Sequence, residues 1–140
     1  MRLTRMLVLL FLASAVGVIR PDPPGEVLAL LQKAADALTN QDAPDFLDYF
    51  DHNMPQYATL RGNIEGLMAA YDVESTIEFV SDEGDNQKRT LTLDWTLVTE
   101  EKAAQRGDQV TRRHIVNCTV ERRGKKWKIT AIEPLDFFKY

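Results

Sequence analysis

The spacing of apolar residues changes once along this chain, near Val73, and that change restricts what the chain can fold into. Before Val73, apolar residues recur every three or four positions, which is the period of a helix with one buried stripe. After it, apolar and polar residues alternate, which is the period of a strand with one buried face. The order predicts helices first and an antiparallel sheet after them.

Three helices are predicted in the first part. The first spans Pro24–Thr39, because proline suits the first turn and apolar residues then follow at helical spacing. Its buried stripe contains Val27, Leu30, Leu31, Ala34, Ala35 and Leu38. Asp42 can cap a second, short helix, DFLDYF. A third covers about Pro55–Tyr71, where Gly62 and Gly66 weaken the helical propensity.

Four strands are predicted in the second part, from the segments STIEFVSD, KRTLTLDWTLVTE, QVTRRHIVNCTVER and KWKITAIE. In the last one, Trp127, Ile129 and Ala131 alternate and are expected to point inward. One face of this sheet is apolar, and the other is rich in threonine and charge. The fold class is therefore α+β, with N-terminal helices packed on the concave face of a curved antiparallel sheet, like a cone.

The first residues have the layout of a secretory signal: MRLTR is basic, MLVLLFLASAVGV is apolar, and the linker PDPPG follows. The apolar run of about 14 residues is shorter than the roughly 20 needed to span a bilayer. We predict a signal peptide over residues 1–20, cleaved after Ala15, then a single domain over 21–140 and a secreted or periplasmic location. An uncleaved membrane anchor is the alternative.

The charge balance argues against a nucleic-acid partner. Cleavage after Ala15 would remove Arg2 and Arg5 from the 17 basic residues, leaving 15 against 21 acidic residues and a net charge of −6. An acidic domain is a poor generic binder of nucleic acid or of an anionic membrane. The basic turn from Arg122 to Lys128 is interpreted as a solvated hairpin tip, because glutamates flank it and its aromatic residue, Trp127, points inward by alternation and so is not available for base contacts.

Cys118 is the sole cysteine of the chain, so it cannot form a disulfide within it. It lies between Val116 and Val120 on the predicted buried face, which indicates a buried structural thiol. His114 is four residues away on the same face, about 13 Å along a strand, too far for a thiolate–imidazole pair.

Three segments together resemble the nuclear transport factor 2-like (SnoaL-like, cystatin-like cone fold) superfamily: EVLALLQKAADALTNQDAPDFLDYFD, LTLDWTLV and HIVNCTVERRGKKWKITAIE. The WKI of the last segment matches the final strand of that superfamily, and the resemblance covers roughly Gly25–Phe138. It implies a cone-shaped domain. Members include isomerases, dehydratases, cyclases and epoxide hydrolases, alongside domains that only bind or dimerise. Many members insert a strand pair before the third helix, and MPQYATLRGNIEGL leaves no obvious room for one, which implies a shallower cone.

Six residues are predicted to line the cavity of such a cone: Phe79, Leu93, Trp95, His114, Val116 and Trp127. The candidate catalytic residues are His114, as a general base, with Tyr49 and Tyr57. Asp94, on the neighbouring strand, falls on the opposite face and could not orient His114, so a half-buried histidine bonded to the backbone is the competing interpretation. No metal-ligand spacing or phosphate-binding loop is present, and no metal or cofactor is predicted.

The prediction is an exported domain without enzymatic activity that binds a small apolar ligand or a protein partner. The resemblance implies a homodimer through the threonine-rich face of the sheet, which carries Ile115 and Val98. One alternative is an isomerase, dehydratase or hydrolase acting on a small apolar substrate in the cone, and another is a purely structural accessory protein. Phe137, Phe138 and Tyr140 near the C-terminus either plug the cone or form a contact patch.

Overall fold

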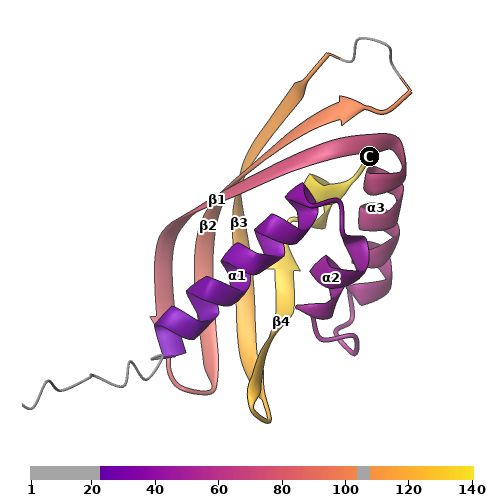
Figure 1. The fold of residues 1–140 in the computed structure, drawn as a ribbon. Helices are drawn as coiled ribbons and strands as arrows, with labels where there is room; N and C mark the ends of the chain where they lie inside the picture. The colour runs from indigo at the N-terminus through magenta and orange to yellow at the C-terminus, as the bar shows by residue number, and fades with distance from the viewer. Residues whose placement is uncertain (1–22, 104–107) are drawn as a thin grey trace, which may run out of the picture.

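The computed structural model describes residues 23–103 and 108–140, and the predicted signal peptide lies outside them. Three helices precede the four strands, and a short 3-10 helix ends the chain (Figure 1). The elements are α1 (Pro23–Thr39), α2 (Ala43–Asp48), α3 (Tyr57–Ala70), β1 (Tyr71–Gly84), β2 (Lys88–Glu101), β3 (Val110–Arg123), β4 (Lys126–Glu133) and η1 (Leu135–Phe138).

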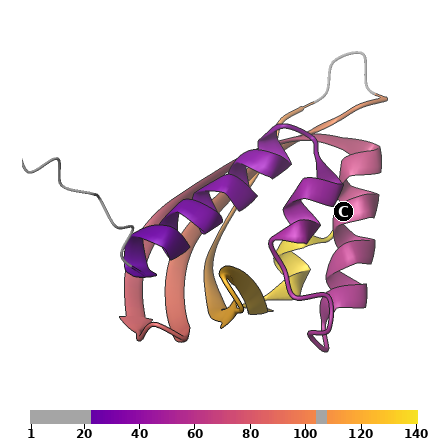
Figure 2. The same cartoon turned by 60° about the horizontal axis from the view of Figure 1, so that its bottom comes forward.

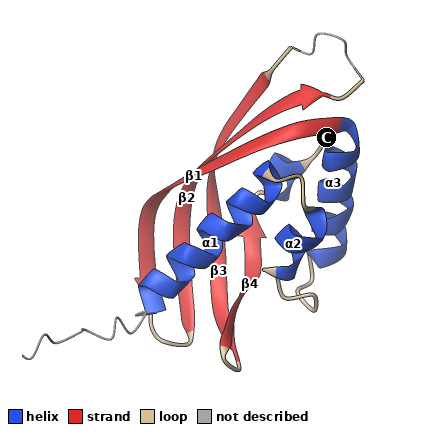
Figure 3. Ribbon diagram, in the orientation of Figure 1, coloured by secondary structure: helices blue, strands red, loops and turns tan. Residues whose placement is uncertain are grey.

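The strands form an antiparallel meander in the order β1-β2-β3-β4. The sheet is strongly curved, and α1 lies across its concave side with α2 and α3 beside it (Figures 2 and 3). The predicted α+β fold class, with the helices on the concave face, is confirmed. None of the described helices is both long enough and apolar enough to cross a bilayer.

The helices begin and end close to the predicted positions. Asp42 caps α2, because its side chain accepts a hydrogen bond of 3.0 Å from the backbone N–H of Asp45. The helix α3 passes through Gly62 and Gly66 without a break. A Cβ atom at Gly66 would lie 2.1 Å from the ring of Tyr140, so glycine at this position makes room for the C-terminal residue.

Two β-bulges interrupt the alternation that the sequence predicts. In β4, Ile129 pairs with Val120 and Ala131 pairs with Thr119, so Thr130 is an extra residue. The alternation reverses at this bulge: Ile132 is buried, and Ala131 lies on the outer face. The prediction that Ala131 points inward is therefore wrong. A similar irregularity lies in β1 between Phe79 and Ser81.

Aromatic rings fill the concave side of the sheet. Phe138 lies 5.3 Å from Trp95, 6.0 Å from Phe46 and 5.1 Å from Phe137, measured between ring centroids. The short helix η1 carries Phe137 and Phe138 into this space, so these two residues plug the cone. Tyr140 remains 70% exposed.

Both edges of the sheet are partly covered by segments that precede it in the sequence. The hydroxyl of Thr39, at the end of α1, bonds both the N–H and the C=O of Ser75 in β1. At the other edge, Ile129 of β4 accepts a bond of 2.8 Å from the N–H of Asp51 and donates one of 2.9 Å to the carbonyl of Tyr49. The helical part of the chain is thereby bonded to both margins of the sheet.

We expect Phe138→Ala to lower the free energy of unfolding by about 3–5 kcal/mol, because the side chain is fully buried among rings that cannot collapse into the space it leaves. Urea unfolding of the two proteins measures the difference. Tyr140→Ala is the matched control, an exposed aromatic residue two positions away, and should change the free energy by only about 0.5 kcal/mol. Equal losses in both variants would contradict the packing described above.

Candidate functional site

The residues predicted to line a cavity are mostly packed against one another. Leu93, Trp95 and Val116 have no exposed surface, and Trp127 is 5% exposed. The indole N–H of Trp95 donates a bond of 2.8 Å to the hydroxyl of Ser75, so its polar atom is already satisfied inside the protein. Phe79 is partly exposed near the margin of the sheet.

His114 lies on the concave side of β3, opposite Trp95 in the β2–β3 register and 6.3 Å from the ring of Phe137. The residue is exposed, and its Nδ1 is 2.7 Å from the carbonyl oxygen of Ile115. Because a carbonyl only accepts, Nδ1 is the donor in this bond. Asp94 does not orient this ring, since its carboxylate binds Arg113 on the outer face with an N–O distance of 2.6 Å.

Tyr49 and Tyr57 line two different hollows. Tyr49 lies in an open groove of about 470 Å³ with Trp127, between α2 and β4. Burial raises the pKa of the Tyr49 hydroxyl, and the nearby carboxylate of Asp45 adds to the rise. Tyr57 stacks on His52 and lines a hollow of about 310 Å³ between α2 and α3. Neither hollow is lined by His114, so the three candidate catalytic residues are not brought together.

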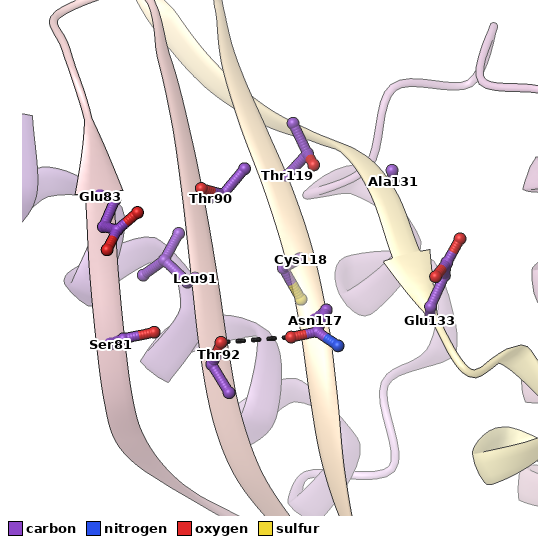
Figure 4. Close-up of a pocket in the computed structure, with 10 residues that line it drawn as sticks. All are labelled: Ser81, Glu83, Thr90, Leu91, Thr92, Asn117, Cys118, Thr119, Ala131 and Glu133. Atoms are coloured by element: carbon purple, nitrogen blue, oxygen red, sulfur yellow. Dashed lines mark hydrogen bonds between the residues drawn. The ribbon is translucent and has the colours of Figure 1, made fainter.

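A groove of about 380 Å³ crosses the outer face of the sheet (Figure 4). All four strands contribute to it, and most of the side chains on its surface carry a hydroxyl, amide or carboxylate group. Its lining residues are Ser81, Glu83, Thr90, Leu91, Thr92, Asn117, Cys118, Thr119, Ala131 and Glu133. The side chains of Leu91 and Cys118 are buried, so the polar residues give the groove its chemistry.

The groove is suited to hydrogen bonding. The hydroxyl of Thr92 donates to the side-chain oxygen of Asn117 at 3.2 Å (Figure 4). Glu83 on β1 and Glu133 on β4 are exposed, and neither forms an ion pair within the described residues. The arrangement offers donors and acceptors to a polar surface, and its lining holds no imidazole and no ionised thiol that could act as a base or nucleophile at neutral pH.

Charged groups elsewhere on the surface are largely paired. Arg113 lowers the pKa of the Asp94 carboxyl by hydrogen bonding to it. In the basic hairpin, Arg122 binds Glu26 at 3.5 Å and lies 4.7 Å above the ring of Trp127, and Arg123 binds Asp51 at 3.1 Å. The predicted solvated tip is therefore partly engaged in contacts with the rest of the domain.

The carboxyl of Asp51, in the segment before α3, accepts hydrogen bonds from Asn53 and Arg123. A hydrogen bond from the backbone N–H of Asn53 lowers the pKa of this carboxyl, and Arg123 lowers it further.

Within residues 23–103 and 108–140, no group of histidine, cysteine, aspartate and glutamate is placed to hold a metal ion.

No protein-family model matches the sequence, and no curated protein matches it either. Solved structures do match. One is a putative scytalone dehydratase from Novosphingobium aromaticivorans, with a TM-score of 0.66 and 8% identity, covering 76% of this chain and 78% of the other. Another is a putative dehydratase from the NTF2-like family of Streptomyces avermitilis, with a TM-score of 0.65 and 10% identity, covering 79% and 93%. A third is a protein of unknown function with a cystatin-like fold from Nostoc punctiforme, with a TM-score of 0.55 and 13% identity, covering 76% and 85%.

The chain has the nuclear transport factor 2-like fold. The resemblance found in the sequence is thereby confirmed at the level of fold. At these sequence identities the structural similarity does not indicate which reaction, if any, the chain shares with these proteins, because the same fold supports unrelated functions.

Sequence reasoning missed the outer groove, although part of the signal was visible. The alternating threonines of β2 indicated a polar outer face. The positions of Ser81 and Ala131 on that face depend on the two bulges, and no residue in the sequence marks either bulge.

Cys118 is buried, as the sequence predicted, and burial raises the pKa of its thiol to about 12. We expect the folded protein to resist alkylation by iodoacetamide at pH 8, because the thiolate is the reactive form and the side chain is covered. Mass spectrometry after timed reaction checks this, with the urea-unfolded protein as the reactive control. Rapid modification under native conditions would contradict the burial of this residue.

Proposed function

We propose that this protein is an exported, non-catalytic binding domain that acts through the outer surface of its sheet. The observation that carries the proposal is the filled interior: Phe137 and Phe138 pack against Trp95, and Phe46 packs against Phe138, where a cone-fold enzyme would hold its substrate. Because aromatic rings of the chain itself occupy the interior, binding of another molecule would use the external faces of the domain.

The polar residues of the interior support the same view. The buried polar or charged residues in the described part of the chain are Ser75, Arg89 and Thr99. Each is engaged: Ser75 accepts from Trp95, Arg89 binds Asp82 at 2.9 Å, and Thr99 donates to the carbonyl of Val110. Acid–base catalysis on an enclosed substrate needs a titratable group free to exchange a proton with it.

The outer face is suited to a second copy of the domain. Ile115 is 46% exposed in the centre of β3, and Val98 is partly exposed on the neighbouring strand. Thr92, Thr96 and Thr111 lie on the same face, and their hydroxyls can bond across a two-fold interface. Asp94, beside Ile115, is already paired with Arg113. The partner proposed for this face is therefore an identical domain.

An isomerase, dehydratase or hydrolase is the alternative function. It is favoured by the names of two structural neighbours and by the imidazole of His114, which a hydrogen bond between Nδ1 and the carbonyl of Ile115 orients on the concave side. It is weakened by the exposure of that imidazole and by the separation of Tyr49 and Tyr57 into different hollows.

Export is tested with the full chain expressed in a bacterium. We expect a processed protein that begins at Val16 and is recovered outside the cytoplasm, because Ala13 and Ala15 fit the small-residue cleavage site. Intact-mass measurement of the fractions identifies the N-terminus. In Ala15→Leu the processing should be lost. A full-length protein in the cytoplasm of the unmodified strain would refute export.

Self-association is tested on the processed protein by sedimentation velocity. We expect a dimer, and we expect Ile115→Lys to shift it to monomer because the added ammonium would be buried without a partner at the interface. Val110→Lys is the matched control, since Val110 is also an exposed aliphatic residue of β3 but pairs with the buried Thr99 and so belongs to the other face. A protein that is monomeric before substitution, or equal effects of the two changes, would overturn the proposed interface.

A further inference from the structure

The free edge of β1 is covered in its first half. The hydroxyl of Thr39 accepts a hydrogen bond of 2.9 Å from the N–H of Ser75 and donates one of 3.2 Å to its carbonyl. The side chain of Gln41 donates one of 2.7 Å to the carbonyl of Val73. These bonds show that the carbonyl of Val73 and both peptide groups of Ser75 point away from β2.

The next part of the same edge is open. Ile77 and Phe79 continue the register of Ser75, and the peptide groups of an antiparallel strand alternate in direction from residue to residue. Their N–H and C=O groups therefore also point away from β2, and no described residue bonds to them. Figures 1 and 2 show the second half of β1 at the margin of the sheet, with no described strand on the side away from β2.

The side chains along the open stretch differ between its two sides. Phe79 is 39% and Val80 59% exposed, which gives the edge an apolar contact surface. On the outer side lie exposed carboxylates, Glu74 and Glu78 before the bulge and Glu83 after it. None of the three forms an ion pair with a cation of the described residues, and Arg113, the arginine near Glu78, is bound to Asp94.

We propose that the open stretch of β1, residues 77–82, is a docking edge for an extended, basic segment of another protein, which adds to the sheet as a further strand. Strand addition derives its affinity from main-chain hydrogen bonds and its specificity from alternating side chains. The inward side chains of the added segment would be apolar and contact Phe79. The outward ones would be lysine or arginine beside Glu78 and Glu83.

The three outward glutamates, Glu74, Glu78 and Glu83, determine which kind of partner can bind this edge. A second copy that paired β1 with β1 would place the glutamates of both copies on one face, and like charges on adjacent strands are destabilising. The same charges attract a basic strand, so they disfavour self-association at this edge and favour a partner of opposite charge. The docking edge does not depend on the outer-face dimer, because strand addition uses the free peptide groups of β1, whereas the proposed dimer contact centres on Ile115 of β3, two strands away.

The first test uses hydrogen exchange followed by NMR on the processed protein. The probe is a synthetic peptide, about six residues long, in which lysine alternates with valine. The amides of Ile77 and Phe79 should exchange rapidly in the free protein and about tenfold more slowly with saturating peptide. The amide of Glu78, which points toward β2, should be protected in both states. The matched peptide with glutamate in place of lysine should give no protection.

The second test uses a pair of charge reversals. Glu78→Lys should weaken binding of the lysine–valine peptide by about fivefold, since it replaces an exposed attraction by a repulsion. Glu133→Lys is the matched control, an exposed, unpaired glutamate on the outer face of β4 at the opposite edge, and should leave the affinity unchanged. Isothermal titration calorimetry measures both. The Ile115→Lys variant should bind as the unmodified protein does, which separates this proposal from the dimer.

Four outcomes would overturn the docking edge. These are protection of Ile77 and Phe79 in the free protein, equal protection by the two peptides, equal losses in the two charge reversals, or protection that rises with protein concentration in the absence of peptide. The last would identify a second copy as the occupant.

Discussion

The hydrogen bond from the indole of Trp95 to the hydroxyl of Ser75 joins the parts on which the rest of the structure depends. Ser75 is also bonded through its backbone to Thr39, at the end of α1. One residue of β1 therefore connects the core of β2 with the first helix. Because an unpaired indole N–H is costly in an apolar interior, the position of Trp95 requires this partner. With Trp95 held, Phe137 and Phe138 have a surface to pack against, and the C-terminal residues close the concave side of the sheet.

That closure decides which surfaces can recognise other molecules. In a cone fold the space between sheet and helices can hold a substrate, but here it is occupied by rings of the same chain. Open features of the described residues lie on the outside and include a polar groove across the sheet and an uncovered stretch of edge. The proposal of surface recognition rests on this filled interior.

The two β-bulges link the fold to these surfaces. In β4 the extra residue, Thr130, moves Ile132 into the core and places Ala131 in the outer groove. In β1 the irregularity after Phe79 allows Ser81 and Glu83 to face outward beside Thr92 and Thr90. A bulge costs local pairing, but here each one changes which side chains line the groove.

The sequence by itself determined the order of the elements, their approximate bounds and the buried face of most strands. It could do so because helical and alternating periods are local patterns, repeated over Pro24–Thr39 and again over β2. The burial of Cys118 followed from the same alternation. The resemblance in the closing hairpin then pointed to the nuclear transport factor 2-like fold that the solved structures share.

Tertiary structure alone decided which of the predicted residues meet. Tyr49, Tyr57 and His114 were grouped as candidates by residue type, yet they lie on separate surfaces because α2, α3 and β3 contribute to different parts of the domain. The sequence also left open whether Phe137 and Phe138 fill the cone. That choice depends on the volume left between the sheet and three helices, and a volume enclosed by distant segments has no local signature in the chain.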